Sequence, residues 1–365
     1  MTAQQVVSLS DPPAPPTRQA TRISSTYTEL AATVRQSGLM ERRYGYYWGR
    51  MLAAIGGLCG LVAGMVWLGD SWWQLLLAAT LGVLVTQFGF LGHDAAHRQI
   101  FKSAAWNDWT ARILSGMFAG LSYGWWRGKH NRHHAAPNQQ GLDPDIRTGV
   151  LDFTGDLAET HPPGARGWFL RRQGWLFFPL LTLEGLHLHW ASISRLLGRE
   201  PVSHRWTEAV LMVTRLGAYV AGLLLLLPPG KAAAFLGVQM AVFGVCLGGS
   251  FAPNHKGMPI VPRTMKLDFL QRQVLMSRNV RGGPWVDTLM GGLNYQIEHH
   301  LFPSMPRPNL KHAQPLVRAH CSELGVPYTE VGLWRSYAIV VDYLNHVGLR
   351  ARAPFDCPLA SQLRD

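Results

Sequence analysis

Four long apolar runs dominate the pattern of hydrophobic and polar positions along this chain of 365 residues. They cover residues 51–68, 72–91, 209–227 and 232–252. Each run is close to the length of about 20 residues that a helix needs to cross a bilayer. Buried helices in a soluble core are the alternative interpretation, but two such runs in succession are rare in soluble folds. The pattern therefore predicts four transmembrane helices.

The runs come in pairs that are joined by very short breaks. Residues 69–71 separate the first two runs, and residues 228–231 separate the last two. Connections of this length permit only tight helical hairpins, and Trp72 and Trp73 suit an interfacial position. We predict an all-α integral membrane protein with two transmembrane hairpins and a helical cytoplasmic cap.

The remaining segments are interpreted from their composition. The shorter apolar run over residues 175–190 predicts a re-entrant or interfacial helix, and residues 264–279 predict an amphipathic helix. The N-terminal part, residues 1–44, is rich in Pro, Ser, Thr and Gln and has no apolar signal segment, so we expect a disordered cytoplasmic tail. Residues 45–330 then form the membrane domain, and residues 331–365 form a C-terminal cytoplasmic extension.

Charge predicts the orientation in the membrane. The formal net charge is +12, and of the 34 Lys and Arg residues only Lys231 falls in an outer loop of the two hairpins. The positive-inside rule therefore places both termini in the cytoplasm of a multi-pass protein of the cell membrane. Together with the apolar runs, the basic charge favours contact with an anionic inner leaflet over binding of nucleic acid. The four cysteines are far apart, which argues against a disulfide framework or a zinc knuckle.

Histidines gather in three short clusters on the predicted inner side of the membrane. His93 and His97 are four residues apart, so on a helix they share one face. The spacing i, i+3, i+4 puts the three histidines of the second cluster on one face as well, and the third cluster is an adjacent pair. One more histidine follows the last apolar run. These other six residues are His130, His133, His134, His299, His300 and His255.

Eight histidines on one side of a membrane predict a di-metal site in the cap. Neutral imidazole is the commonest metal ligand in proteins. A zinc site takes about four ligands, so eight histidines fit two ions of a first-row metal better than one zinc ion. The ligand type alone suits iron, copper, zinc or nickel. Four nearby carboxylates are candidates for orienting the imidazoles: Asp94, Asp143, Asp145 and Glu298.

Several other polar residues have more than one interpretation. His187 and His189 are undecided between a ligand and a structural role. Arg215, inside the third run, either reaches the inner face of the membrane or pairs with a buried acid. The remaining histidines are interpreted as surface or capping residues: His161, His204, His312, His320 and His346.

The order of the histidine clusters resembles a known family. The motifs HDAAH, HNRHH and QIEHH, which start at residues 93, 130 and 296, are similar to the three histidine boxes of the membrane fatty acid desaturases. The segment GGLNYQIEHHLFP, followed by Pro306 and Arg307, resembles the third box of the acyl-lipid and linoleoyl-CoA type. The segment QVLMSRNVRG, from Gln273, resembles the stretch ahead of that box in bacterial members. The likeness covers roughly residues 40–330.

The resemblance implies a non-haem di-iron centre that uses O2 and two electrons to leave a cis double bond in an acyl chain. By position, the implied iron ligands in the boxes are His93, His97, His130, His133, His134, His299 and His300. His255 resembles an additional ligand outside the boxes, and Asn254 is a weaker candidate for holding a water beside the metal. Gln296 stands where other members have a histidine, which leaves its contact with iron open.

The resemblance also implies partners. The substrate would be a long-chain acyl group on coenzyme A, acyl carrier protein or a lipid, whose unactivated C–H bonds require a metal-based oxidant. Electrons would come from a separate ferredoxin- or cytochrome-type donor with its reductase, docked on the basic cytoplasmic face. Residues 161–164 are a chance near-match to the haem motif of fused cytochrome b5 domains, and no such domain is expected. Four aromatic residues either line the acyl channel or anchor the chain at the interface: Trp125, Trp126, Trp175 and Tyr295.

Two alternatives belong to other functional classes. Related histidine patterns serve lipid or carotenoid hydroxylases and ketolases, whose products keep an oxygen atom. The second alternative is a non-enzymatic membrane protein that binds metal or haem, and a haem would give a Soret band. A transporter, however, places ionisable residues near mid-membrane, whereas these histidines follow the ends of the apolar runs.

Overall fold

The computed structural model describes residues 18–160 and 163–349, and residues 1–17, 161–162 and 350–365 lie outside the described part. Nearly all of the secondary structure in the described chain is helical, with one pair of short strands. In chain order its elements are α1 (Arg18–Gln36), α2 (Tyr44–Leu68), α3 (Gln74–Ala96), α4 (Ala104–Ile113), the π-helix η1 (Leu114–Ala119), α5 (Tyr123–Ala135), the 3-10 helix η2 (Pro144–Ile146), α6 (Asp156–Glu159), α7 (Gly164–Leu170), α8 (Gln173–Leu197), α9 (Arg205–Leu226), α10 (Pro229–His255), α11 (Phe269–Leu275), β1 (Asn279–Arg281), α12 (Pro284–Leu289), α13 (Gln296–Leu301), α14 (Arg307–Glu323), β2 (Glu330–Gly332) and α15 (Leu333–Gly348).

Four helices correspond to the four apolar runs. By length and composition, α2, α3, α9 and α10 are able to cross a membrane, which confirms the predicted all-α fold with four candidate spans. Two of these helices extend beyond their apolar runs. Helix α3 continues past Leu91 to Ala96, and α10 continues past Ala252 to His255. Histidines that follow these runs in the sequence are therefore held by the ends of the span helices themselves.

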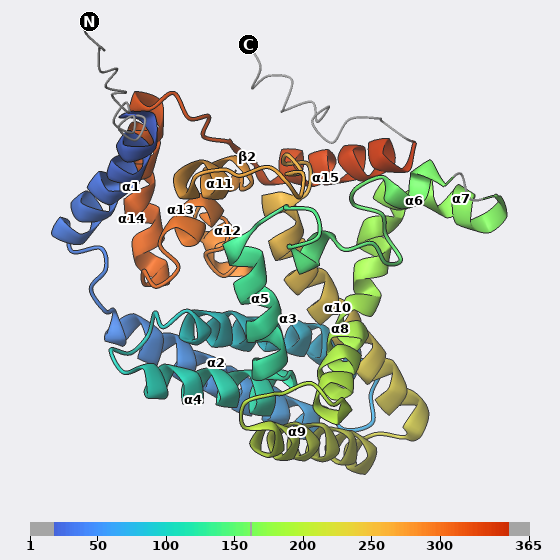
Figure 1. Ribbon diagram of the computed structural model, residues 1–365. Coiled ribbons are helices and arrows are strands. Elements are labelled where there is room, and N and C mark those ends of the chain that lie inside the picture. Colours follow the sequence, from blue (N-terminus) through green and yellow to red (C-terminus); the bar gives the residue numbers. More distant parts are fainter. Residues whose placement is uncertain (1–17, 161–162, 350–365) are drawn as a thin grey trace, which may run out of the picture.

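The turns of the two hairpins meet at one end of the bundle. Asp70, which follows α2, forms a 2.7 Å ion pair with Lys231 at the start of α10. The side-chain amide of Gln74 donates to the carbonyl oxygens of Met65 and Gly69, both at 2.8 Å, and so closes the first turn. The other ends of α3 and α10 lie away from these turns, on the side of α11–α13 (Figure 1). The two hairpins therefore have the same orientation.

Helix α10 lies at the centre of the bundle, where its backbone closely approaches α3 on one side and α8 on the other. A Cβ atom on Gly244 of α10 would lie 2.2 Å from the carbonyl oxygen of Leu181 in α8. On the other side, a Cβ atom on Gly82 of α3 would lie 2.8 Å from the carbonyl oxygen of Gln239 in α10. Glycine at such contacts lets helix backbones approach each other closely. This packing fixes the ends of α3 and α10 relative to each other.

The predicted re-entrant or interfacial helix over residues 175–190 is α8. It is one continuous helix of 25 residues that packs along α10 and α15. Its outer side is apolar, with Trp175, Leu186 and Trp190 exposed. An exposed apolar side of this kind suits contact with lipid.

A cap of short elements packs against the end of the bundle that lies away from the hairpin turns. Strand β1 pairs in parallel with β2, and Asn279 is opposite Glu330. A hydrophobic core joins α1, α11, α13 and α14 and includes the fully buried side chains of Val274, Ile297 and Val317. The cap therefore holds α13, the helix of the third histidine cluster, between α11 and α14.

The predicted amphipathic helix over residues 264–279 is wrong in length, because only α11 is helical there. Asp268 caps its start by accepting a hydrogen bond from the backbone N–H of Gln271 at 3.1 Å. After Met276 the chain leaves the helix, since the backbone N–H of Arg278 donates to the carbonyl oxygen of Asn254 at 2.8 Å. These tertiary hydrogen bonds end the helix early.

The predicted disordered tail over residues 1–44 is wrong from Arg18 onward, where α1 begins. Helix α1 lies beside α14 (Figure 1), with Leu30 and Val34 buried in the core of the cap. The Tyr27 hydroxyl donates to the carbonyl oxygen of Leu301 at 2.9 Å, at the end of α13. A few apolar residues in helical spacing are enough for this segment to pack, because α14 supplies the partner surface.

The predicted C-terminal extension is also part of the packed structure over residues 331–348. These residues complete β2 and form α15, which packs across α8 and α10. Gly348, at the end of α15, lies directly against the backbone of Leu170 in α7.

Candidate metal centre

The structure brings the three histidine clusters together in the interior. Two groups of imidazoles have their ligand nitrogens within 4.8 Å of one another. The first group comes from the end of α3, from α5 and from α13, and it consists of His93, His97, His130 and His299. The second group comes from α5, from the end of α10 and from α13, and it consists of His133, His255 and His300.

The nitrogen atoms of the first group lie close enough together to share one ion. The Nε2 atoms of His97 and His130 are 2.8 Å apart. Ligands at about 2.1 Å from one ion lie roughly 3.0–3.4 Å from each other. Nε2 of His93 and both ring nitrogens of His299 are buried and have no hydrogen-bond partner. Unsatisfied buried nitrogens are costly, so an ion bound by them explains their convergence.

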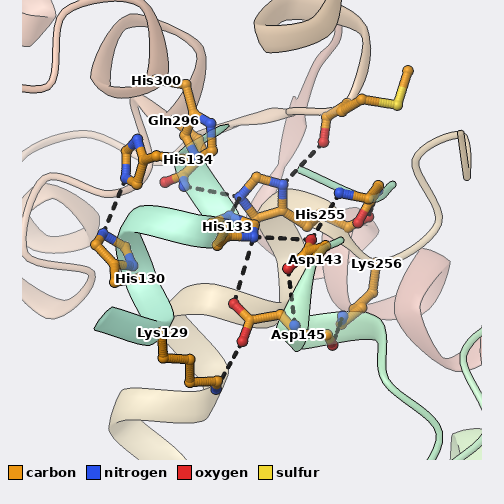
Figure 2. A network of polar contacts seen from close by, with 12 residues as sticks. Lys129, His130, His133, His134, Asp143, Asp145, His255, Lys256, Gln296 and His300 are labelled. Carbon is orange, nitrogen blue, oxygen red and sulfur yellow. Dashed lines mark hydrogen bonds and ion pairs between the residues drawn. The ribbon is translucent and has the colours of Figure 1, made fainter. Parts of the chain in front are cut away.

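The second group is held in place by hydrogen bonds on its outer nitrogens (Figure 2). Nδ1 of His133 is 3.0 Å from a carboxylate oxygen of Asp143. Nδ1 of His255 donates to the carbonyl oxygen of Met276, and Nδ1 of His300 donates to Oε1 of Gln273, both at 2.9 Å. A proton on Nδ1 leaves Nε2 free to bind metal, which is how histidine ligands are usually oriented. The Nε2 atoms of His133 and His255 accordingly meet at 3.2 Å.

His134 lies between the two groups. Its Nε2 atom is 3.0 Å from Nε2 of His130 in the first group. Its ring stacks on that of His300 in the second group, with centroids 4.3 Å apart and an interplanar angle of 17°. The structure therefore places all eight candidate histidines in one cluster, with His134 within reach of either group.

Gln296 and Asn254 lie at the edge of the second group. The Gln296 amide nitrogen is 2.9 Å from Nε2 of His255. The Asn254 amide donates to the Gln296 oxygen at 3.2 Å. Exchange of the oxygen and nitrogen of the Gln296 amide would turn a metal-binding oxygen toward His255. Both residues therefore lie beside His255, and the contacts of Gln296 with metal and of Asn254 with a water stay predictions.

Two of the four predicted carboxylates lie beside His133 (Figure 2). Burial acts to lower the pKa of the His133 imidazole, but the hydrogen bond and the negative charge of Asp143 outweigh burial and raise this pKa. Asp145 lies 3.5 Å from the same nitrogen and forms a 2.7 Å ion pair with Lys129. Burial acts to raise the pKa of Asp145, but Lys129 and His133 outweigh it and lower this pKa. Both carboxylates therefore present negative charge to the outer side of a candidate ligand.

The other two carboxylates face different partners. Asp94 pairs with Arg307 at 2.6 Å and is 3.5 Å from Nδ1 of His93. Glu298 accepts hydrogen bonds from Asn279 and the Tyr328 hydroxyl, both at 2.7 Å. The expectation that Glu298 orients a histidine is wrong, because its side chain points from α13 into the cap.

Sequence reasoning missed residues that support the site. Gln273 and the carbonyl group of Met276 hold two ligands of the second group, and Arg307 neutralises Asp94. The Gln273 amide also donates to the carbonyl oxygen of His134 at 3.0 Å. A single buried amide or a backbone carbonyl has no local sequence pattern of its own, and the only signal was that these residues lie in or beside the segments that resemble the family.

Burial keeps most of the imidazoles neutral. It lowers the pKa of His97 from 6.5 to about 3. The same cause holds the pKa well below 6.5 for His130, His134, His299 and His300. Neutral imidazole is the form that binds metal.

The histidines outside the clusters do not join the two groups within the described chain. His187 is exposed and lies 3.1 Å from Glu184, and His189 is buried and 2.7 Å from the carbonyl oxygen of Gly185. His161 lies outside the described residues. His204, His312, His320 and His346 are absent from both groups.

Arg215 has a partner that the sequence did not predict. Its guanidinium donates to the carbonyl oxygen of Phe118 at 3.3 Å and lies 4.4 Å from the centroid of the Tyr219 ring.

The four aromatic residues that the sequence offered as channel or interface candidates lie in different surroundings. Trp126 stacks on His130 at 4.3 Å, whereas Trp175 is 69% exposed on α8. Trp125 packs at the edge of the bundle core and Tyr295 at the edge of the cap core.

These features define a class, a helical membrane protein with a histidine-rich metal site. The profile of the family described as fatty acid desaturase matches residues 70–332. The chain belongs to the membrane fatty acid desaturase family. It is a fatty acid desaturase, an oxidoreductase that acts on an acyl substrate in a lipid environment.

Individual relatives cover most of the chain. It is 30% identical over 342 residues to the Delta(5) fatty acid desaturase fat-4 of Caenorhabditis elegans, covering 90% of this chain and 75% of that one. It is 27% identical over 358 residues to the Delta(8)-fatty-acid desaturase of Helianthus annuus, covering 92% and 75% respectively. It is 29% identical over 329 residues to the Acyl-lipid (9-3)-desaturase of Physcomitrium patens, covering 88% of this chain but only 62% of that one.

Proposed function

We propose that this desaturase uses O2 and two iron ions to introduce a cis double bond into a long-chain acyl group. The observation that carries the proposal is the convergence of imidazole nitrogens from four separate segments into two adjacent groups. The proposed ligands, which are also the residues around which the reaction takes place, are His93, His97, His130, His133, His134, His255, His299 and His300.

Iron suits the donor set because every proposed ligand is an imidazole. When bound, the two ions would supply the O2-dependent oxidant that an unactivated methylene C–H bond requires. The chain orients the ligands through Asp143, Gln273 and the carbonyl group of Met276. Trp126 and Phe251 cover the first group, since Trp126 stacks on His130 and the Phe251 ring is 6.2 Å from that of His93. Aromatic cover of this kind excludes bulk water from the reacting groups.

We propose that the protein is a multi-pass protein of the cell membrane with both termini in the cytoplasm. The joined turns around Asp70 and Lys231 would lie outside, and the histidine groups would lie at the cytoplasmic face. The distribution of Lys and Arg supports this orientation. The electron donor would be a separate ferredoxin- or cytochrome-type protein with its reductase, which docks on the basic cytoplasmic face.

The substrate is proposed as an acyl group on a lipid, coenzyme A or acyl carrier protein. The names of the relatives carry different double-bond positions, Delta(5), Delta(6) and Delta(8), and two relatives are named as acyl-lipid desaturases. These names support a new double bond on the carboxyl side of the chain, and they favour a lipid carrier.

The test is expression in a host that lacks the activity, followed by fatty-acid profiling by mass spectrometry. We expect a new monounsaturated or further unsaturated acyl product without added oxygen, whereas a hydroxylated or keto product would contradict desaturation. The purified chain should contain two iron ions, and turnover should require an added electron-transfer protein. Product formation with NAD(P)H alone would overturn the proposal of a separate donor.

A further inference from the structure

The segment between the first two histidine clusters folds back along the bundle. After α3 ends, α4 and η1 run along it in the opposite direction. A Cβ atom on Gly92 of α3 would lie 2.8 Å from Oγ of Ser115, and the Phe88 ring stacks on that of Phe118 with centroids 4.5 Å apart. Helix η1 therefore runs antiparallel to α3. The segment descends from the histidine end toward the hairpin turns.

Contacts with α9 give the depth of this descent. The position of a Cβ atom on Gly116 lies 3.2 Å from Leu211, and that on Gly120 lies 3.6 Å from Leu216. Residues later in η1 thus contact residues later in α9, so the two helices run in the same direction. Leu216 is 11 residues from the start of this 22-residue helix (216 − 205 = 11), a rise of roughly 16 Å. The turn after η1 therefore lies level with the middle of a candidate span.

The chain then reverses and returns to the histidines as α5. Gly120 makes the turn with a φ of 74°, a left-handed conformation that favours glycine. The backbone N–H of Leu121 donates to the carbonyl oxygen of Ser115 at 2.8 Å, and Ser122 caps α5. We refer to α4, η1 and α5 together as the re-entrant element. Non-helical backbone at this depth needs protein partners, because lipid offers no hydrogen bonds.

Helix α9 supplies these partners with two charged side chains. Glu208 is 1% exposed and accepts hydrogen bonds from the Ser122 hydroxyl at 2.6 Å and from the backbone N–H of Gly124 at 3.1 Å, at the start of α5. Arg215 donates to the carbonyl oxygen of Phe118 near the end of η1. The two side chains are seven residues apart, so they lie on the same face of α9.

The sign of each charge matches the helix end that it meets. The first turn of a helix carries partial positive charge and the last turn carries partial negative charge. Glu208 faces the first turn of α5, and Arg215 faces the last turn of η1. Glu208 also pairs with Arg112 of α4 at 3.3 Å. All three parts of the re-entrant element are thus bound by α9.

We propose that Glu208 and Arg215 are positioning residues that set the place of α5 and, through it, of both groups of proposed metal ligands. This inference rests on the proposed function. Gly124 is six residues before His130, a rise of about 9 Å, so a tilt of about 10° at the start of α5 would move His130 by roughly 1.6 Å. Metal–ligand distances tolerate only about 0.2 Å. Since α5 supplies His130 to one group and His133 to the other, its displacement affects both groups at once.

The test compares full-length variants in lipid nanodiscs by hydrogen–deuterium exchange and by iron content. Glu208→Gln and Arg215→Met should each raise the exchange rate of amides in residues 118–135 about ten-fold, as expected for a lost helix cap. Iron retention against a chelator should fall about ten-fold or more in both groups together. Arg215→Lys should stay near the wild type, because it keeps a donor and its charge. Val213→Met, on the exposed side of α9, is the matched control.

A charge exchange separates this proposal from a general need for balanced charge. The double variant Glu208→Arg with Arg215→Glu keeps the net charge but reverses it at both helix ends, so we expect faster exchange than in either single variant. Behaviour like the wild type would overturn the proposal, and so would unchanged exchange in Glu208→Gln. Arg112→Met should have a smaller effect than Glu208→Gln, because it leaves both hydrogen bonds to α5. If the wild type binds no iron, the proposed function fails, while the exchange data still decide the roles of Glu208 and Arg215.

Discussion

The replacement Asp143→Asn removes one charge from the outer side of the second group of histidines. In the structure, Oδ2 of Asp143 accepts from Nδ1 of His133 at 3.0 Å and from the backbone N–H of Asn138 at 2.7 Å, and Oδ1 accepts from the backbone N–H of Asp145 at 2.8 Å. An asparagine has one acceptor oxygen where the carboxylate has two. Its amide nitrogen must therefore face a backbone or imidazole donor.

The magnitude follows from which contact is lost. With the amide oxygen kept toward His133, the hydrogen bond becomes a neutral one, and the N–H of Asp145 loses its acceptor. A hydrogen bond to a charged group contributes about 1.5–3 kcal/mol, against about 0.5–1.5 kcal/mol for a neutral one. The difference of about 1–2 kcal/mol corresponds to a loss of about ten-fold or somewhat more in metal affinity. Losses of about 10–100-fold are typical when a partner of a histidine ligand is removed.

The assay measures iron per chain by mass spectrometry during titration with a chelator. We expect one of the two ions to be removed at about ten-fold lower chelator concentration, because only the second group contains His133. Asp70→Asn makes the same chemical change in the first hairpin turn, away from the histidines, and should leave both ions in place. Equal loss of both ions, or no loss at all, would refute the reasoning that Asp143 acts through His133 alone.

Three further predictions use other parts of the structure. His97→Ala should abolish desaturation and lower the iron content while the spans still insert, whereas His346→Ala, exposed on α15, should do neither; product and metal analysis check both. Gly244→Val should destabilise the bundle by about 3 kcal/mol through its contact with α8, and Gly237→Val, with open space around it, should not; melting in detergent compares them. The metal-free chain should lose stability as the pH falls below 6.5, because burial lowers the pKa of His97 to about 3 and the unfolded chain binds its proton first; a flat dependence between pH 7.5 and 5.5 would contradict this.

The parts of the fold that depend on local pattern could be predicted from the sequence. Apolar runs of span length identify α2, α3, α9 and α10, because crossing a bilayer depends on length and composition more than on partners. The histidine clusters were found because helical spacing makes them share a face, and they come together as expected. The extension of α3 and α10 beyond their apolar runs was not predicted, since the cap replaces lipid as their surroundings there.

The parts that depend on distant partners could not be predicted. Leu30 and Val34 look unremarkable in a Pro- and Ser-rich segment, yet α14 gives them a surface to pack on. Arg215 offered two interpretations, and the actual partner is a backbone carbonyl freed by the turn of the re-entrant element. Glu298 stands beside two candidate ligands in the sequence, but in a helix neighbouring residues point in different directions.

Both proposed metal sites take their histidines from the same three kinds of segment, and this explains why the two sites lie side by side. Each combines histidine from the end of a span, from α5 and from α13, with α3 serving the first group and α10 the second. The spacing of the two groups is therefore set by the spacing of the ends of α3 and α10, which pack closely at Gly82. Helices α5 and α13 contribute to both groups and so prevent either from moving alone. A change in the contact between α3 and α10 should consequently alter the distance between the groups before it removes any ligand.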